Sequence, residues 1–479
     1  MRIVLKKNQN IPTEGAIVYL VKEKDLDQLA LAQNERAYLD ERLENKERQI
    51  VINRFPNWIY VEVLDDKKKG CQMHEALRKS AHNFHKTIHA NRHKEVNVVD
   101  LIGDGDATLA FMEGLALTNY QFLKYFKEVD TKKHVLESIH VFSDNISERD
   151  LSDLTAVVQG VYYARDLVNE PVSYLNAVQL GEEIKNLGAE AGFKVEVFGK
   201  SKIQALKMGG LLAVNKGSID PPTFSVMEWA PEDAVNEQPL VLVGKGIVYD
   251  TGGLSLKPTK DSMDQMKSDM GGAAAVIGAI YAAAKAKLPV HVIGLIPSTD
   301  NRPDGNAYAP GDVITMYNGL NVEVLNTDAE GRMILADALS YASKFKPGFV
   351  MDLATLTGAA AVAIGKFGVV AMGNSDAEKR MELLKQCGQK VYERIVEFPF
   401  WEEYGELIKS DIADIKNLGG RDGGAITAGK FLEHFTDYPW VHLDIAGPAF
   451  VTAMDNYRGK GGTGVGVRLL FDFIKQYKA

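Results

Sequence analysis

The stretch PLVLVGKGIVYDTGGLSLKP, residues 239–258, decides the fold class. Its first six residues are apolar on both faces of an extended chain, which is typical of a strand covered by helices on both sides. Similar apolar runs lie at 290–297, 322–325, 349–353 and 440–445, and helical patterns lie between them at 271–287, 333–345, 376–395 and 425–436. This alternation predicts an α/β fold with a central mixed sheet flanked by helices.

The first 145 residues predict a smaller domain of the same class. Strand-like runs at 16–21, 58–64, 96–102 and 136–142 alternate with helical segments at 25–46 and 72–92. A further helical pattern ends at Asn169-Glu170-Pro171, because a residue that precedes proline disfavours helix. We therefore predict an amino-terminal α/β domain at 1–145, a connecting helix at 146–170 and a larger carboxy-terminal domain at 171–479.

Composition excludes several classes of protein. A chain of 479 residues with 46% hydrophobic and 25% charged residues is neither disordered nor fibrous, and it is too long for one ordinary core. The net charge of −9 argues against nucleic acid as an obligatory partner. Two cysteines cannot build a disulfide framework, and no secretory signal or membrane-spanning run is visible. We expect a cytoplasmic protein with no membrane attachment.

The chemistry is expected in the larger domain, because most of its buried strands run directly into a glycine-rich or acidic segment. Ligands of open α/β sheets bind outside the carboxyl ends of the strands. One such segment is NTDAEGR (326–332), in which Asp328, Glu330 and Arg332 are two residues apart. If it is extended, all three side chains project from one side, and Gly331 lets the chain turn before a helix. The alternative is a loop whose acids cap that helix or pair with Arg332.

A second cluster follows the strand at 239–244. It consists of Lys245, Asp250, Lys257 and Asp269, which lie on one long strand-and-loop segment. Together with Asp328 and Glu330 it contains four carboxylates, which would repel one another and raise each other's pKa unless cations hold them. Two divalent ions balance four negative charges, so we predict a dinuclear metal site. The alternative is a set of separate surface salt bridges.

These two clusters and several further motifs resemble those of the leucine aminopeptidases, also called cytosol aminopeptidases. The similarity is carried by GKGIVYDTGGLSLKP, DMGGAAAV, NTDAEGR, DLATLTGA, SDIADIKN, GGAIT and HLDIAGP, which occur in this order between residues 244 and 448. The resemblance implies that 171–479 is a catalytic metallopeptidase domain. It also implies a homohexamer that removes amino-terminal residues, leucine and other mainly apolar ones, from peptides with a free amino terminus.

The resemblance implies roles for individual residues. The ligands of two divalent ions (zinc, manganese or magnesium) would be Lys245, Asp250, Asp269, Asp328 and Glu330. Lys257 and Arg332 would be catalytic, with a bicarbonate at Arg332 that takes a proton from a metal-bridging water, and the resulting hydroxide would attack the peptide. The substrate pocket would be lined by Met266, Thr355, Leu356, Gly358 and Ala446. Asp264 is a rival to Asp269, because the loop from Lys257 to Asp269 holds one residue more than the family's usual loop.

Other patterns leave alternatives open. Four histidines at helical spacing lie one residue out of phase with the apolar stripe of the helix at 72–92, so we expect them on its solvent-facing flank rather than around zinc; they are His82, His85, His89 and His93. Asp352 and Asp444, inside apolar strands, either orient the metal ligands or are ordinary hydrogen-bonded core acids. A dinuclear phosphoesterase and a non-catalytic binding protein are the alternative functions.

Overall fold

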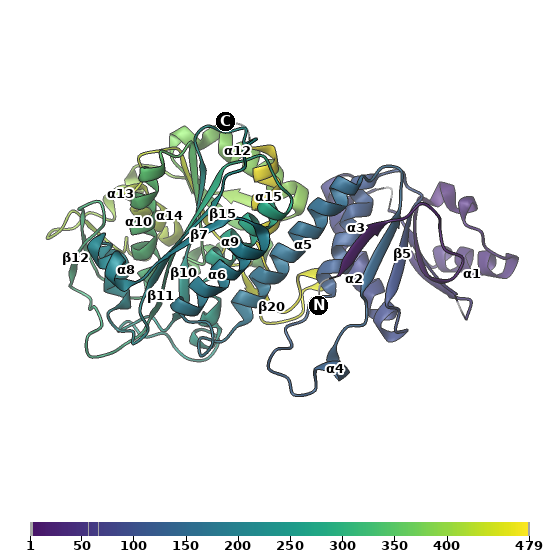
Figure 1. Cartoon of the computed structure of the whole chain (residues 1–479), viewed down its shortest axis with the longest axis horizontal. Helices are drawn as coiled ribbons and strands as arrows, with labels where there is room; N and C mark the ends of the chain where they lie inside the picture. Colours follow the sequence, from purple (N-terminus) through teal and green to yellow (C-terminus); the bar gives the residue numbers. More distant parts are fainter. Residues whose placement is uncertain (1–2, 56, 66, 478–479) are drawn as a thin grey trace. The chain divides into compact units, whose positions relative to one another are not determined.

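The computed structural model describes residues 3–55, 57–65 and 67–477 (Figure 1). The chain forms two compact units. The first comprises Met1–Gln159 and Ala453–Gly459, and the second comprises Gly160–Thr452 and Lys460–Ala479. The division falls inside helix α5 (Glu148–Asn169), which occupies the range of the predicted connecting helix. Within the described ranges, no helix combines the length and the apolar character needed to cross a membrane.

The amino-terminal unit is built on a six-stranded sheet with the order β1-β6-β5-β2-β4-β3. Its strands pair in parallel except β3 with β4. The strands are β1 (Val4–Lys7), β2 (Gly15–Val21), β3 (Gln49–Asn53), β4 (Asn57–Val63), β5 (Glu95–Asp100) and β6 (Ser138–Phe142). The helices are α1 (Gln33–Glu44), α2 (Cys71–Ala90), α3 (Gly105–Thr118) and the short α4 (Val129–Lys132). All four predicted strands of this region are present.

The apolar stripe of α2 is buried as predicted, but the expectation that its histidines face solvent is wrong for His82 and His85. Both are buried, with 8% and 3% of their surface exposed. The Nε2 atom of His85 lies 2.9 Å from Oδ1 of Asn119, and its ring packs on His134 with centroids 4.7 Å apart. Helix α2 packs along α3, and residues after α3, Asn119 and His134, contact α2 at His85. Helical periodicity identifies only one buried side.

The larger unit contains a mixed sheet with the strand order β16-β15-β18-β14-β9-β11-β8-β7, and β10 pairs with β11 beside this path. Strands β18, β14, β9, β11 and β10 are mutually parallel, while β8, β7 and β15 introduce antiparallel pairs. The strands are β7 (Lys194–Phe198), β8 (Thr223–Trp229), β9 (Leu240–Gly244), β10 (Gly246–Asp250), β11 (Val292–Asn301), β14 (Phe349–Ala354), β15 (Val369–Gly373), β16 (Ile395–Glu397) and β18 (Trp440–Asp444).

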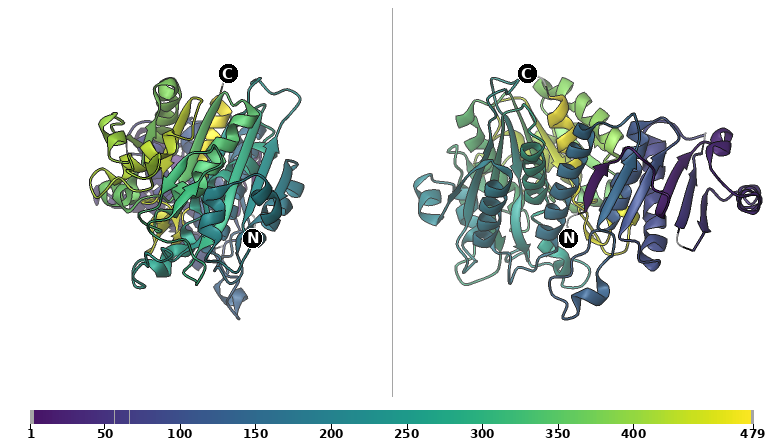
Figure 2. Two further views of the ribbon diagram at one scale, coloured as in Figure 1. Left: turned by 90° about the vertical axis from the view of Figure 1, so that its left-hand side faces the viewer. Right: turned by 45° about the vertical axis from the view of Figure 1, so that its right-hand side comes forward.

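Helices cover both faces of this sheet (Figure 2). Helices α6 (Ala177–Ala191), α9 (Gly271–Lys285) and α15 (Val467–Gln476) form one layer, and α8 (Gly209–Asn215), α10 (Glu330–Ala342) and α14 (Gly424–Glu433) pack together in the other. The remaining helices are α7 (Lys200–Ala205), α11 (Gly358–Ile364), α12 (Glu378–Val391) and α13 (Glu403–Glu406). The predicted α/β class and flanked mixed sheet are confirmed. Central strands such as β9 and β14 are buried along their whole length, as their unbroken apolar runs indicated.

The run at 322–325 is an exception, since it does not join the large sheet. Strand β13 (Asn321–Glu323) instead belongs to a small sheet with β12 (Val313–Thr315) and β17 (Ile415–Lys416). Only its central Val322 is buried, and its neighbours are partly exposed. A four-residue apolar pattern is too short to distinguish a core strand from a peripheral one.

Candidate active site

The parallel strands bring the predicted site residues to one edge of the large sheet. Lys245 follows β9 directly, Asp250 ends β10, and Thr355 follows β14. Ala446 comes two residues after the end of β18. Because these strands run in the same direction, their carboxyl ends meet, which is the location predicted from the polar segments that follow the apolar runs.

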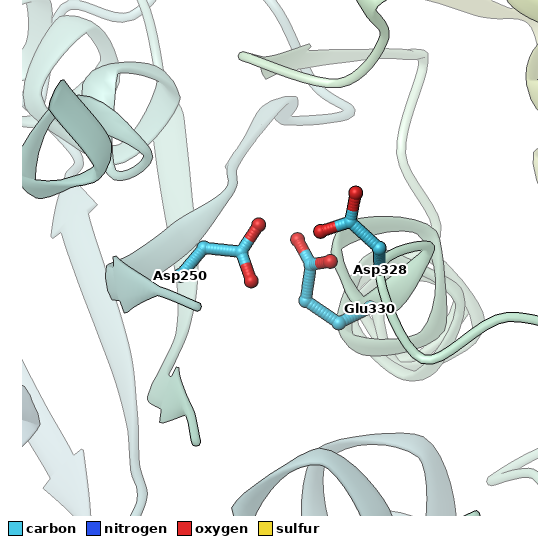
Figure 3. A group of neighbouring side chains, drawn as sticks. All are labelled: Asp250, Asp328 and Glu330. Carbon is cyan, nitrogen blue, oxygen red and sulfur yellow. The ribbon is translucent and has the colours of Figure 1, made fainter. Parts of the chain in front are cut away.

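Three carboxylates face one another at this edge. Asp250, Asp328 and Glu330 each offer an oxygen, and these oxygens all lie within 4.8 Å of one another. Figure 3 shows Asp250 approaching from its strand and the other two from the start of helix α10. Asp250 and Glu330 are only 2% and 1% exposed. Three acids held this close and largely out of water need positive charge among them.

Lys245 connects this group to Asp269. Its Nζ atom lies 2.7 Å from Oδ1 of Asp269, 2.9 Å from Oε1 of Glu330 and 2.8 Å from the carbonyl oxygen of Thr355. Burial alone would lower the pKa of Lys245, but the carboxylates of Asp269 and Glu330 raise it above its ordinary value. The rival residue Asp264 is exposed in the helical turn η2 (Met263–Ser268), whereas Asp269 is buried. The structure therefore brings Asp269, not Asp264, to the cluster.

Lys257 approaches the three carboxylates from the other side. Its Nζ atom lies 3.0 Å from Oδ2 of Asp250 and also pairs with Oδ1 of Asp328. Burial is the largest cause that raises the pKa of Asp328, and repulsion from Asp250 and Glu330 raises it further, to about 7. The alternative of separate surface salt bridges is wrong, because these charges form one buried network.

The expectation that NTDAEGR is extended up to a turn at Gly331 is wrong. Helix α10 begins at Glu330, so Gly331 and Arg332 lie in its first turn. Gly331 has a different role, since a Cβ atom there would lie 2.7 Å from Nζ and 2.8 Å from Cδ of Lys245. The missing side chain of Gly331 provides the space that the Lys245 amine occupies. A local motif cannot show this contact, because the two residues are far apart in the sequence.

Arg332 lies beside the cluster, and its guanidinium group donates to a backbone carbonyl oxygen. Its Nη1 atom donates to the carbonyl oxygen of Asn417 at 2.8 Å, and its Nε atom has no hydrogen-bond partner within the described residues. Burial lowers the pKa of Arg332 to about 10, although Glu330 opposes the shift. A buried guanidinium with a free N–H group is suited to hold a small anion.

The residues predicted to line a pocket are partly exposed around the same edge. Thr355 donates from Oγ1 to Oδ1 of Asp269 at 2.8 Å. The backbone N–H groups of Leu356 and Ala446 both donate to Oδ1 of Asp444, so their two loops lie side by side. Gly358 begins α11, and Met266 lies in η2 three residues before Asp269.

Three residues to which the sequence analysis assigned no role support the cluster. Asn301 donates from Nδ2 to Oδ1 of Asp250 at 2.8 Å and to the carbonyl oxygen of Thr327 at 3.0 Å. Tyr308 donates to the same carbonyl oxygen at 2.9 Å. The side chain of Asn417 holds the backbone of the loop before Asp328 through Leu325 and Asn326. A polar residue at the end of an apolar run is a sequence signal that could have identified Asn301, because Asn301 ends β11.

The donor set fits divalent cations. Within the described residues, Oδ2 of Asp269 and Oε2 of Glu330 are buried and have no hydrogen-bond partner. A buried carboxylate oxygen without a partner is costly unless something else binds it. Carboxylate oxygens and a lysine amine in one buried cluster are ligands that zinc, manganese and magnesium accept.

Comparison with known proteins leads to the same chemistry. The model of the cytosol aminopeptidase family, catalytic domain, matches residues 162–471. A probable cytosol aminopeptidase of Chloroherpeton thalassium is 49% identical over 360 residues, which are 73% of this chain and 69% of the relative. Another from Chlorobium limicola is 47% identical over 383 residues, which are 77% of this chain and 75% of the relative.

A solved structure is similar over nearly the whole chain. It is bottromycin maturation enzyme BotP in complex with Mn, with a TM-score of 0.85, 28% identity, and coverage of 97% of this chain and 99% of that one. The family model and the curated relatives carry the assignment. The chain therefore belongs to the cytosol aminopeptidase family, whose members are metal-dependent peptide hydrolases that act as aminopeptidases.

Proposed function

We propose that the protein releases amino-terminal residues, leucine and other mainly apolar ones, from peptides with a free amino terminus. The observation that carries this proposal is the convergence of Asp250, Asp328 and Glu330 within 4.8 Å, with Lys245 and Lys257 paired to them. In line with its family, the protein would act in the cytoplasm as a homohexamer.

The metal ligands would be five residues of this cluster. Asp250 and Glu330 are the most deeply buried of the three facing acids, and both would hold metal. The unpartnered oxygens of Asp269 and Glu330 would each gain a partner. When bound, two divalent cations lower the pKa of a shared water and polarise the scissile carbonyl group. Lys245, Asp269 and Asp328 would complete the set. Zinc and manganese both suit it, and the related BotP structure is a complex with Mn.

Two positively charged side chains of the protein would act in the remaining steps of the reaction. Lys257 would stabilise the negative charge that develops on the carbonyl oxygen, because its amine already lies among the carboxylates at 3.0 Å from Asp250. Arg332, with its free buried Nε–H group, would hold a bicarbonate anion that accepts a proton from the attacking water. Met266, Thr355, Leu356, Gly358 and Ala446 would line the pocket for the first side chain of the peptide.

The proposal is tested by removing the metal and restoring it. The chain is stripped with a chelator, reconstituted with zinc or manganese, and assayed with leucine p-nitroanilide and p-nitrophenyl phosphate in parallel. We expect hydrolysis of the aminoacyl substrate to be lost after chelation and restored by metal. Hydrolysis of the phosphate ester alone would favour a dinuclear phosphoesterase, and metal binding without either activity would favour a binding protein.

A further inference from the structure

A buried acid at the end of β18 holds the two loops that border the proposed substrate pocket. Asp444 is 1% exposed. Its Oδ1 atom accepts hydrogen bonds from the backbone N–H of Leu356 at 3.2 Å and of Ala446 at 3.1 Å. Its Oδ2 atom accepts from the hydroxyl of Thr357 at 2.7 Å. We propose that Asp444 is a positioning residue that fixes these loops and thereby sets substrate affinity and selectivity.

Backbone pairing between β14 and β18 reaches Ala354, whose carbonyl oxygen accepts from the N–H of Ile445 at 2.8 Å, and the bonds to Asp444 continue the connection beyond that point. The Leu356 loop follows β14, and the Ala446 loop follows β18, so they belong to different strands. One carboxylate that accepts from both backbones holds them at a common distance. Because an ionised carboxylate is a charged acceptor, each hydrogen bond to it is stronger than one between neutral groups.

The hydroxyl of Thr357 extends the connection to helix α11. It donates to Asp444 and accepts from the backbone N–H of Ala360 at 3.0 Å, so Thr357 is the N-cap of that helix. Gly358, a predicted pocket residue, is the first residue of α11. The orientation of this first turn therefore depends on the same carboxylate.

Burial raises the pKa of Asp444, and the neighbouring His442 opposes this shift. His442 lies two residues earlier on β18, and residues two apart on a strand point to the same face. Its Nδ1 atom lies 2.6 Å from Oδ1 of Asp352, whose Oδ2 accepts from Nε1 of Trp440 at 2.7 Å. Burial would lower the pKa of His442, but Asp352 and then Asp444 raise it. A buried carboxylate needs such a partner.

The hydrogen bonds of Asp444 differ from those of the proposed metal ligands. Within the described residues they go to the pocket loops, and none goes to the carboxylate cluster. Loss of the carboxylate should therefore change how substrate is held before it changes how metal is bound. The inference rests on the proposed aminopeptidase function only for the identity of the substrate.

The test compares Asp444→Asn with a matched variant, Glu393→Gln. Glu393 is also buried and also accepts from two backbone N–H groups and one side chain, at Gly466, Leu469 and Arg468. Those bonds hold the start of α15, so Glu393→Gln removes an equivalent carboxylate outside the proposed pocket. Thr357→Val removes the same Thr357 bond without changing the acid, in case Asp444→Asn fails to fold.

Three quantities are measured on the reconstituted wild type and variants: bound metal, steady-state kinetics on leucine, alanine and phenylalanine p-nitroanilides, and backbone hydrogen exchange by mass spectrometry. For Asp444→Asn we expect unchanged metal content, exchange about tenfold faster in peptides that contain 355–360 and 445–449, and a KM about tenfold higher with a smaller change in kcat. The ratio of kcat/KM between substrates should also change. Glu393→Gln should alter none of these.

Unchanged exchange in both loop peptides would overturn the inference. So would faster exchange with unaltered KM and selectivity, or faster exchange spread evenly over the larger unit. If the wild type lacks aminopeptidase activity, the proposed function fails, while the exchange data still decide whether Asp444 holds the loops.

Discussion

Substitution of Gly331 by alanine tests the claim that this position makes room for a metal-binding lysine. The added Cβ would lie 2.7 Å from Nζ and 2.8 Å from Cδ of Lys245. Lys245 is 2% exposed, and its amine is held by Asp269, Glu330 and the carbonyl oxygen of Thr355. The lysine therefore cannot move away from the methyl group without breaking at least one of these interactions.

The expected loss of metal affinity or activity follows from the hydrogen bond that Lys245 loses. A hydrogen bond to a charged group contributes about 1.5–3 kcal/mol, which corresponds to roughly a tenfold to 150-fold loss of metal affinity or activity. Alanine stabilises a helix relative to glycine by up to about 1 kcal/mol. Because Gly331 lies in α10, this gain offsets part of the cost of the broken interaction, so thermal stability should fall only slightly. Metal affinity and activity are thus predicted to fall much more than stability.

The assay titrates zinc or manganese into the metal-free variant and measures hydrolysis of leucine p-nitroanilide, with a thermal melt alongside. Gly405→Ala in α13 is the matched control, since a Cβ there would meet nothing within 4 Å. A Gly331→Ala protein that binds metal and hydrolyses substrate like the wild type would show that Gly331 is not needed to make room for Lys245. A large drop in melting temperature would contradict the prediction too, because the loss would then be one of folding.

Two other predictions concern Lys257 and His85. Lys257→Met should lower kcat on leucine p-nitroanilide about a hundredfold or more with metal content unchanged, as expected for a group that stabilises a developing oxyanion; wild-type kcat would contradict this role. Burial lowers the pKa of His85 from 6.5 to about 4, so the unfolded chain binds a proton more readily than the folded one between these values. His85 therefore contributes full stability above about pH 6.5, and on the order of 3 kcal/mol is lost as pH falls toward 4. Urea unfolding of His85→Gln should show a smaller pH dependence than the wild type, and an equal dependence would contradict the assignment.

Much of the larger unit could be predicted because its signals are local. The run at 239–244 is apolar on both faces, and the structure places it as β9 in the middle of the sheet. Polar residues directly after such runs, Lys245 and Asp250 among them, had to meet at one edge once the strands were parallel. The convergence of charges followed from topology and sequence alone.

Other features depend on contacts between distant residues and left no local signal. Helix α10 begins at Glu330 rather than after Gly331, and the reason for the glycine is Lys245, which lies between β9 and β10. His85 is buried because Asn119 and His134 cover its side of α2. Asn301 supports Asp250 from the end of a neighbouring strand, and an asparagine there carries no motif of its own.

Locating the metal ions tests the proposed dinuclear metal site most directly. Crystals of the wild type and of Glu330→Ala are grown with Mn²⁺, and anomalous diffraction is recorded at the manganese absorption edge. We expect two neighbouring peaks in the wild type among the five proposed ligands, Lys245, Asp250, Asp269, Asp328 and Glu330. The variant should lose at least one peak and the hydrolysis of peptides. Ions bound elsewhere, or hydrolysis that persists with this cluster empty, would contradict the proposed site.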